Sequence, residues 1–292
     1  MKLAKLVKPY QIAKGRRFHL KDVDPGDTLG LELDPKTAKE LLQAGIERLA
    51  ELQELLYADN RWALLIIFQA MDAAGKDSAI KHVMSGVNPQ GCRVYSFKAP
   101  SEEDLRHDYM WRSVARLPES GYIGIFNRSY YEETLVVRVH REMLDSQHLP
   151  ESLMGPKIWK QRFEDINAIE RFWARNGIVT CKFFLHVSKA EQRRRFLKRL
   201  EEPDKHWKFS THDLAERQHW DEYAAAYEEM ICATAKPEAP WHIVPADNKW
   251  FTRLVVVAAI IDRLEDLGLK YPKPDAAIER QLRAAKRALQ RG

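Results

Sequence analysis

An aspartate and a lysine that follow an apolar segment are the residues best placed to do chemistry in this chain. Asp72 and Lys76 lie in Leu-Leu-Ile-Ile-Phe-Gln-Ala-Met-Asp-Ala-Ala-Gly-Lys-Asp-Ser, residues 64–78, where an apolar run gives way to small residues and then to a predicted helix. The order of strand, glycine, lysine and helix is typical of a loop whose backbone N–H groups bind a phosphate. The sequence therefore predicts that the protein acts on phosphoryl groups.

This loop departs from the usual pattern G-x-x-x-x-G-K-[ST] at Ala70 and Asp77. Asp72 also places a carboxylate where an anion should bind, which is favourable only if a cation lies between carboxylate and phosphate. We therefore expect Asp72 to bind Mg²⁺. An ordinary strand–turn–helix connection with a capping aspartate is the alternative. Phosphate contacts are expected along the loop and the start of the helix, at Ala73, Ala74, Gly75, Lys76, Asp77 and Ser78.

The composition indicates a soluble globular protein, with 45% hydrophobic residues and a mild net charge of +5 in 292 residues. Cys92, Cys181 and Cys232 show no metal-binding spacing, and their odd number argues against a disulfide framework. The N-terminus lacks the apolar region of a signal peptide, and the apolar run at residues 254–261 is too short to cross a bilayer. We therefore expect a cytoplasmic protein that binds no membrane.

Short apolar runs alternate with helical patterns after residue 33, which predicts crossover units and a parallel sheet with helices on both faces. We expect an extended N-terminal arm of residues 1–33, one α/β domain of residues 34–270 and a charged C-terminal helix or tail of residues 271–292. The domain is predicted to be a three-layer sandwich around a five-stranded parallel sheet. Its strands are expected at 63–69, 93–97, 122–127, 179–187 and 242–244, and helices at 35–57, 76–86, 101–117, 156–176, 188–200, 248–267 and 276–290.

Cationic side chains follow four of the five predicted strands. Because ligands of such sheets bind at the carboxyl ends of the strands, we expect Lys98, Arg112 and Arg128 to lie near the phosphate loop. Arg128 could instead pair only with Glu132 or Glu133, one helical turn later.

The segment 189–208 is basic, with eight Lys or Arg against four acidic residues, and the tail of residues 280–291 is basic as well. We interpret residues 189–212 as a lid whose arginines close over phosphates and stabilise developing charge. A solvated basic helix is the alternative. Arg195 and Arg199 would share one helix face, and Arg194 and Lys198 another. The phosphate-binding candidates of the lid are Arg194, Arg195, Lys198, Arg199 and Lys208.

Several blocks of sequence together resemble the family-2 polyphosphate kinases. They are residues 68–77, 86–91, 96–100, 107–112, 125–132 and 182–188, and the similarity extends over about residues 10–270. The resemblance implies a P-loop kinase fold and transfer of the terminal phosphoryl group of inorganic polyphosphate to a nucleotide, with Mg²⁺ or Mn²⁺. It further implies that Asp72, Lys76 and Arg128 are the central active-site residues, and that lid residues such as Arg195 and Arg199 hold polyphosphate.

The resemblance also bears on the acceptor. Gln69-Ala70 in place of a glycine-rich start, and Asn127 in place of aspartate, resemble the subfamily that accepts AMP as well as ADP, the class III-like enzymes. Ser78 and Tyr130 depart from residues common in relatives. Nucleotide contacts are expected from Asn127, Arg128, Tyr131 and Glu132.

The partners implied are inorganic polyphosphate and the nucleotides AMP, ADP and ATP, with guanine nucleotides as further candidates, in a homo-oligomer (dimer or tetramer). An ATP-dependent nucleoside monophosphate kinase would use the same loop and lid, and it is the first alternative. A nucleic-acid-binding protein is the second. It would require stacking aromatic residues among the basic ones, whereas the arginine cluster contains only Phe196.

Overall fold

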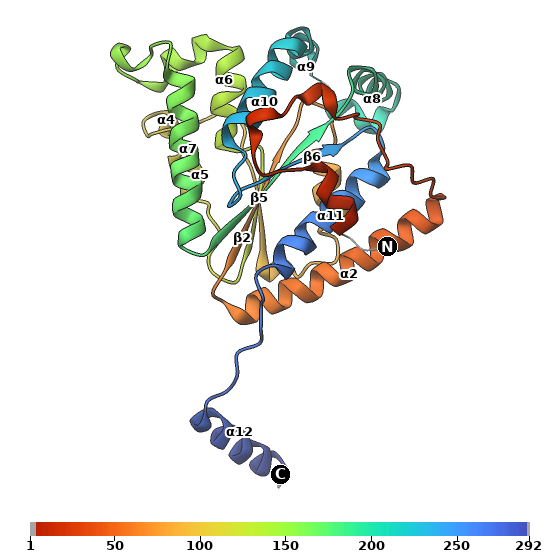
Figure 1. The fold of residues 1–292 in the computed structure, drawn as a ribbon, viewed down its shortest axis with the longest axis vertical. Helices are drawn as coiled ribbons and strands as arrows, with labels where there is room; N and C mark the ends of the chain where they lie inside the picture. Colours follow the sequence, from red (N-terminus) through yellow and green to blue (C-terminus); the bar gives the residue numbers. More distant parts are fainter. Residues whose placement is uncertain (1–3, 209, 291–292) are drawn as a thin grey trace.

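The computed structural model describes residues 4–208 and 210–290, which form one α/β body and a separate C-terminal helix (Figure 1). The sheet has six strands in the order β1-β6-β5-β2-β4-β3. β2 to β6 are parallel, and only β1 runs antiparallel, beside β6. The strands are β1 (Gln11–Ile12), β2 (Ala63–Gln69), β3 (Cys92–Ser96), β4 (Ile123–Asn127), β5 (Ile178–His186) and β6 (Trp241–Pro245).

The five predicted parallel strands are therefore confirmed within a residue or two, but the strand count of five is wrong. The sixth strand comes from the N-terminal arm, where Gln11 pairs with His242 and Ile12 with Trp241. This pairing covers the backbone groups at the free edge of β6, which would otherwise stay unpaired. A strand of two residues leaves no periodicity by which the sequence could reveal it.

Six of the seven predicted helices are found, the seventh is divided, and the structure adds short and long helices that were not predicted. The segment expected as one helix at 101–117 forms two short helices, because Asp108 accepts a hydrogen bond from the Met110 N–H and turns the chain between them. α1, α6, α9 and α10 were not among the predicted helices. The helices are α1 (Ala4–Val7), α2 (Pro35–Asp59), α3 (Lys76–Val83), α4 (Glu102–Leu105), α5 (Trp111–Val114), α6 (Val136–Val139), α7 (Ile158–Arg175), α8 (Lys189–Glu201), α9 (Thr211–Glu216), α10 (Trp220–Thr234), α11 (Lys249–Glu265) and α12 (Ala276–Leu289).

Helices cover both faces of the sheet, as the three-layer prediction requires. Leu64, Ile66 and Phe68 of β2 belong to one apolar cluster with residues of α2, α3 and α11, whereas Leu65 and Ile67 belong to a second cluster with residues of α7 and α10. All seven residues of β2 are buried, which explains its uninterrupted apolar sequence. The central strand is thus held on both sides and fixes the start of the phosphate loop.

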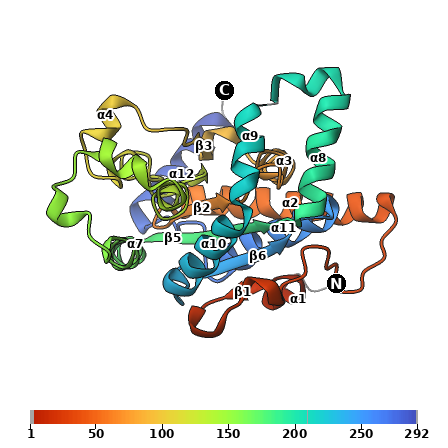
Figure 2. The same ribbon diagram turned by 90° about the horizontal axis from the view of Figure 1, so that it is seen from above.

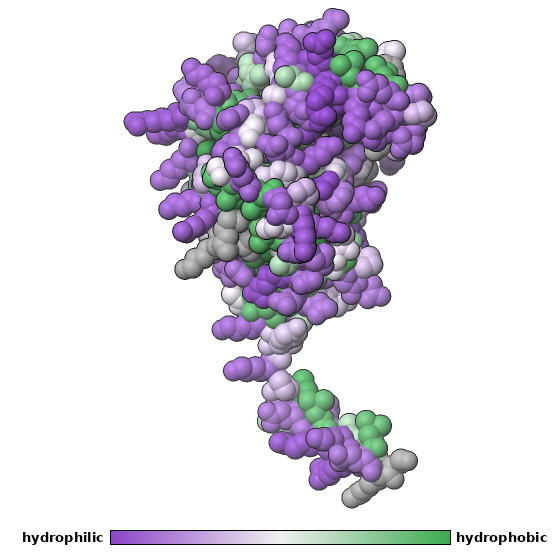
Figure 3. All heavy atoms as spheres, turned by 90° about the vertical axis from the view of Figure 1, so that its right-hand side faces the viewer, coloured by the Kyte–Doolittle hydropathy of each residue, from purple (hydrophilic) through white to green (hydrophobic). Residues whose placement is uncertain are grey.

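The lid and the C-terminus occupy opposite ends of the molecule. Figure 2 shows α8 and α9 standing beside each other at one edge of the body, and Arg199 of α8 lies 3.4 Å from Asp213 of α9. α12 is separated from the body by an extended segment and carries exposed apolar side chains, among them Ile278, Leu282 and Leu289 (Figure 3). In the described residues, no helix is both long and apolar enough to span a membrane.

Candidate active site

The phosphate loop joins the end of β2 to the start of α3 and is built on left-handed backbone. Ala73 has φ +59° and Gly75 has φ +110°. Lys76 is the first residue of α3, and its ammonium donates to the Ala70 carbonyl over 3.0 Å, which closes the loop around its own side chain. The first N–H groups of α3 have no partner within the helix, so they are available to an anion.

Arg128 connects this loop to the end of β4. Its guanidinium donates to Asp72 over 3.1 Å and to Glu132 over 3.3 Å, so that the phosphate-loop pairing and the local pairing considered for Arg128 occur together. Arg128 has φ +63°, and a left-handed arginine costs free energy of order 1–3 kcal/mol, as at many functional sites. The carboxylates of Glu132 and Asp72 raise the pKa of Arg128.

The positively charged side chains of Lys76 and Arg128 lie close to each other beside the phosphate loop. Burial and the nearby Arg128 lower the pKa of the Lys76 ammonium. Two cations held close together in a partly buried place favour an anion between them. The structure thus places Asp72, Lys76 and Arg128 close together at the phosphate loop, and their roles stay predictions.

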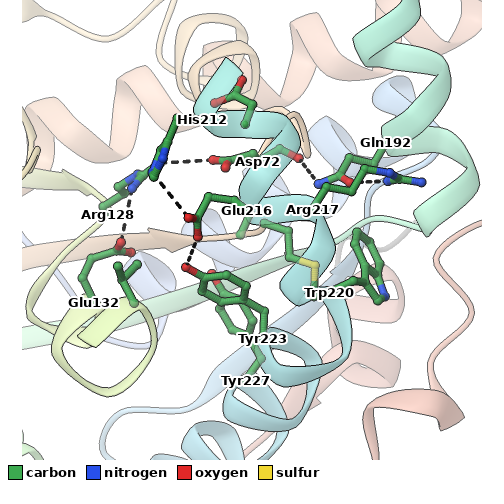
Figure 4. A pocket seen from close by; sticks show the side chains of 14 residues that line it. Asp72, Arg128, Glu132, Gln192, His212, Glu216, Arg217, Trp220, Tyr223 and Tyr227 are labelled. Carbon is green, nitrogen blue, oxygen red and sulfur yellow. Dashed lines mark hydrogen bonds and ion pairs between the residues drawn. The ribbon is translucent and has the colours of Figure 1, made fainter. Parts of the chain in front are cut away.

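A cavity of about 120 Å³ lies beside Asp72 and Arg128, and Gln192 and His212 from the lid segment help to line it (Figure 4). The wall that α10 contributes was not singled out from the sequence, because α10 was not recognised as a helix. The lining residues are Ala70, Met71, Asp72, Arg128, Glu132, Val136, Gln192, His212, Asp213, Glu216, Arg217, Trp220, Tyr223 and Tyr227.

Glu216 holds the lid side of this cavity in place. Its carboxylate accepts a hydrogen bond from the Tyr223 hydroxyl at 2.5 Å, and His140 and His212 lie 3.0 and 3.5 Å away. Burial alone would raise the pKa of Glu216, but the hydrogen bonds from Tyr223 and His140 outweigh burial and lower it. For Asp213, burial and the facing Asp72 raise the carboxyl pKa. The wall that faces Arg128 is thus rich in carboxylates.

Arg195 does not face the site, which corrects the expectation that it binds polyphosphate. Its side chain is buried, and its guanidinium donates to Glu191 and to backbone carbonyls of the phosphate loop. Tyr131, expected to touch the nucleotide, is also misassigned. It is fully buried and bonds Glu170, and the ammonium of Lys182 donates to its hydroxyl. In both side chains, hydrogen bonding within the protein uses the polar group that a substrate would need.

The other lid cations lie nearer the surface. Arg194 is exposed and pairs with Glu191, Lys198 is exposed and lies 3.5 Å from Glu202, and Arg199 pairs with Asp213. Lys208 ends the 3₁₀ turn Pro203–Lys208, and its side chain lies outside the described part of the chain.

Two cations of α11 extend the basic surface of the lid, and the sequence analysis missed both. Arg253 donates to the Ser78 hydroxyl over 3.0 Å, on the first turn of α3. Burial and the neighbouring Arg195 and Arg253 lower the pKa of Lys249. Their position directly after β6 was the signal that could have identified them, because this strand end was expected at the site.

Of the remaining predicted residues, Asn127 contacts the start of α3, whereas Lys98 and Arg112 contact each other. Asn127 donates to Asp77 over 2.7 Å, so the end of β4 also touches the start of α3. Arg112 donates to the Lys98 carbonyl over 2.7 Å and lies over the Phe97 ring. Lys98 and Arg112 are thus brought together beyond β3.

Comparison with known proteins agrees with this arrangement. A family model described as polyphosphate kinase 2 (PPK2) matches residues 32–271. The chain is 52% identical over 244 residues to the ADP-polyphosphate phosphotransferase of Rhodopseudomonas palustris, which covers 83% of this chain and 84% of that protein. It is 42% identical over 274 residues to the AMP/ADP-polyphosphate phosphotransferase of Meiothermus ruber, which covers 94% of this chain and 98% of that protein.

The fold is similar as well. A crystal structure of polyphosphate kinase 2 from Arthrobacter aurescens matches with a TM-score of 0.84 at 38% sequence identity, covering 98% of this chain and 97% of the other. The resemblance seen in the sequence blocks is thereby confirmed. The chain, with its phosphate loop, its Asp72–Arg128 contact and its lid, belongs to the polyphosphate kinase 2 family.

Proposed function

We propose that this protein transfers the terminal phosphoryl group of inorganic polyphosphate to AMP and ADP, forming ADP and ATP. The observation that carries the proposal is a cavity lined by Asp72 and Arg128 next to the phosphate loop that Lys76 closes, with basic residues of α8 nearby. The names of the relatives support both the donor and the acceptors, since they include an ADP- and an AMP/ADP-polyphosphate phosphotransferase. Guanine nucleotides are further candidate acceptors, because one relative at 32% identity is named a GDP-polyphosphate phosphotransferase.

The reaction requires positioning and charge neutralisation more than covalent catalysis. An oxygen of the nucleotide's terminal phosphate attacks the last phosphorus of the chain in line. The bond from that phosphorus to its bridging oxygen breaks, and the shortened polyphosphate leaves with the electron pair. Lys76 and the N–H groups at the start of α3 hold the chain end, and Arg128 neutralises charge on the transferred group.

The cavity is too small for a whole nucleotide. Sites that enclose ligands of that size usually measure about 300–1,000 Å³, whereas this one measures about 120 Å³. We assign this cavity to the terminal phosphate of the acceptor nucleotide. We infer that α9 moves outward to admit the sugar and base of the nucleotide. Polyphosphate then runs along the other side of the loop, past Arg253, Lys249 and Lys198.

The residues present fit a divalent ion that is held partly by substrate. Among residues 4–208 and 210–290, no group of three or more His, Cys, Asp or Glu could hold a metal alone. Mg²⁺ commonly binds through one or two carboxylates together with substrate phosphates, and Asp72 supplies such a carboxylate beside the phosphate loop. Bound there, Mg²⁺ or Mn²⁺ would neutralise phosphate charge. Asp72 itself keeps Arg128 oriented toward the loop over 3.1 Å.

A donor comparison tests the proposal. Purified protein is incubated with Mg²⁺ in three parallel reactions. The first contains long-chain polyphosphate and AMP, the second contains polyphosphate and ADP, and the third contains ATP and AMP. The nucleotides are then separated by chromatography. We expect ADP and ATP to form in the polyphosphate arms. Product formed only from ATP plus AMP would make the protein an ATP-dependent nucleoside monophosphate kinase and would overturn the proposal.

A cytoplasmic location, a dimer or tetramer, and the lack of nucleic-acid and membrane partners stay predictions.

A further inference from the structure

Three consecutive carbonyl groups of the phosphate loop accept hydrogen bonds from side chains of α8. Gln192 Nε2 donates to the Asp72 carbonyl over 2.9 Å. Arg195 Nη1 donates to the Ala73 carbonyl over 3.0 Å and to the Ala74 carbonyl over 2.6 Å. Side chains of α8 therefore bind the carbonyl groups of residues 72–74 and leave the N–H groups of the loop free of contacts from this helix.

The guanidinium of Arg195 is fully used in these contacts. Its Nη2 donates to the Ala246 carbonyl over 2.6 Å and to the Asp247 carbonyl over 3.2 Å, in the loop after β6. Its Nε donates to Glu191 over 2.7 Å, which also balances its charge. A guanidinium has five N–H groups in a fixed plane, and here each has a partner. With 6% of its surface exposed, Arg195 has no donor left for a substrate.

The loop requires such support from outside. Ala73 and Gly75 both have positive φ, a conformation that is costly for alanine and persists only where surrounding groups determine it. Carbonyls that were free to rotate toward the phosphates would repel them. Hydrogen bonds from α8 turn these carbonyls away and leave the N–H groups for the anion.

We infer that Arg195, assisted by Gln192, is a positioning residue that holds the phosphate loop in its binding conformation and does not itself contact polyphosphate. The inference rests on the proposed function for its catalytic consequence. It also divides the lid, because the first two turns of α8 are bound to the loop and to the chain after β6. Movement that admits substrate must then begin beyond Arg195, in the segment that carries Arg199 and α9.

Arg195→Lys is the most direct test, because it keeps the charge but replaces five planar donors on three nitrogens with three donors on one nitrogen, which cannot make all of these contacts at once. Misplacement of reacting groups by about 1 Å costs about 100-fold in rate. We therefore expect kcat to fall about 100-fold, while KM for polyphosphate changes less than about threefold at every chain length. Hydrogen–deuterium exchange should rise in peptides that cover residues 70–77 and stay unchanged in β2.

Matched variants on the same helix separate positioning from substrate binding. Arg193→Lys, at an exposed position, should keep both the kinetics and the exchange of the wild-type protein. Arg199→Lys should raise KM for polyphosphate and leave exchange in the loop unchanged. Gln192→Glu keeps an acceptor for Arg217 but places an oxygen against the Asp72 carbonyl, so it should also lower kcat and raise exchange in the loop. This variant serves as the second test in case Arg195→Lys folds poorly.

The inference is wrong if Arg195→Lys behaves like Arg199→Lys, with a raised KM that depends on chain length and with unchanged loop exchange. It is equally wrong if kcat and exchange both remain at wild-type values. The exchange measurement needs no substrate. Wild-type protein that fails to use polyphosphate would therefore defeat the proposed function, while exchange in the variants would still decide the role of Arg195.

Discussion

Arg128 Nη2 donates to Asp72 Oδ1 over 3.1 Å and joins the end of β4 to the phosphate loop after β2. β2 and β4 are neighbours in the sheet, with Phe68 paired to Asn127, so the two side chains start from adjacent strand ends. The backbone strengthens this connection, since the Arg128 N–H donates to the Phe68 carbonyl over 3.0 Å. The carboxylate of Asp72 and the guanidinium of Arg128 are thus brought together by the register of neighbouring strands.

Replacing Arg128 by lysine should reduce catalysis more than binding. A lysine cannot reach Asp72 and Glu132 together, because its charge is a single point on a flexible stem. We expect kcat to fall about 100-fold, comparable with the loss of one preorganised donor at other active sites, with KM for the nucleotide raised less than tenfold. Steady-state kinetics with polyphosphate and AMP measure both. Arg138→Lys, in a pair with Glu229 outside the cavity, serves as control. Turnover near the wild-type value in Arg128→Lys would contradict its role.

Asp72→Asn should change the requirement for metal. An amide is a weaker ligand than a carboxylate, so we expect the Mg²⁺ concentration for half-maximal activity to rise about 10-fold or more. A titration of activity against Mg²⁺ measures this. Asp77→Asn is the comparison, because Asp77 already accepts a hydrogen bond from Asn127 and is not assigned to the metal. Identical Mg²⁺ curves for wild type and Asp72→Asn would remove Asp72 from the metal site.

Tyr131→Phe should weaken the fold and spare the reaction. The Tyr131 hydroxyl donates to Glu170 over 2.7 Å and accepts from Lys182 over 2.9 Å, all within the core. Losing these bonds should lower the free energy of unfolding by about 1–3 kcal/mol, measured in urea. KM for AMP should not change. A rise in KM without loss of stability would instead restore the nucleotide contact expected from the sequence.

His242 should make the fold sensitive to acid. Burial lowers the pKa of His242 to about 4, and its side chain is 2% exposed. Because the unfolded chain takes up this proton near pH 6.5, the contribution is fully present above that pH and is lost as the pH falls toward 4. We expect a loss of about 2 kcal/mol between pH 7.5 and pH 5 from this group.

The control for this pH effect is a histidine at the surface. Urea unfolding at both pH values should show a smaller pH dependence in His242→Gln than in wild type, whereas His107→Gln, at an exposed position, should keep the wild-type difference. An unchanged pH dependence in His242→Gln would show that other groups cause the loss in acid.

Much of the fold could be predicted because its signals are local. The apolar run of β2 and the cap of α2, where Asp34 accepts from the N–H groups of Lys36 and Thr37, are written in neighbouring residues. The two-residue β1 has no such signal, since only the exposed edge of β6 defines it.

The site could be predicted where position along a strand decides the role. Lys76 and Arg128 follow strand ends, and topology brings strand ends together. Arg195 could not be assigned correctly, because a guanidinium serves phosphate oxygens and backbone carbonyls equally well, and only the packing of α8 decides between them. The role of Tyr131 was predicted wrongly for a related reason, since its partner Lys182 lies on β5, distant in the sequence, and is fully buried.

Transfer of label from donor to acceptor tests the central claim most directly. Polyphosphate labelled with ³²P is mixed with excess protein, Mg²⁺ and AMP, and the reaction is stopped within one turnover and separated into nucleotide, polyphosphate and protein. The account predicts label in the β-phosphate of ADP, none bound covalently to protein, and no transfer by Lys76→Met. Label that stays on the protein, or a Lys76→Met variant that transfers it at the wild-type rate, would contradict direct transfer at the phosphate loop.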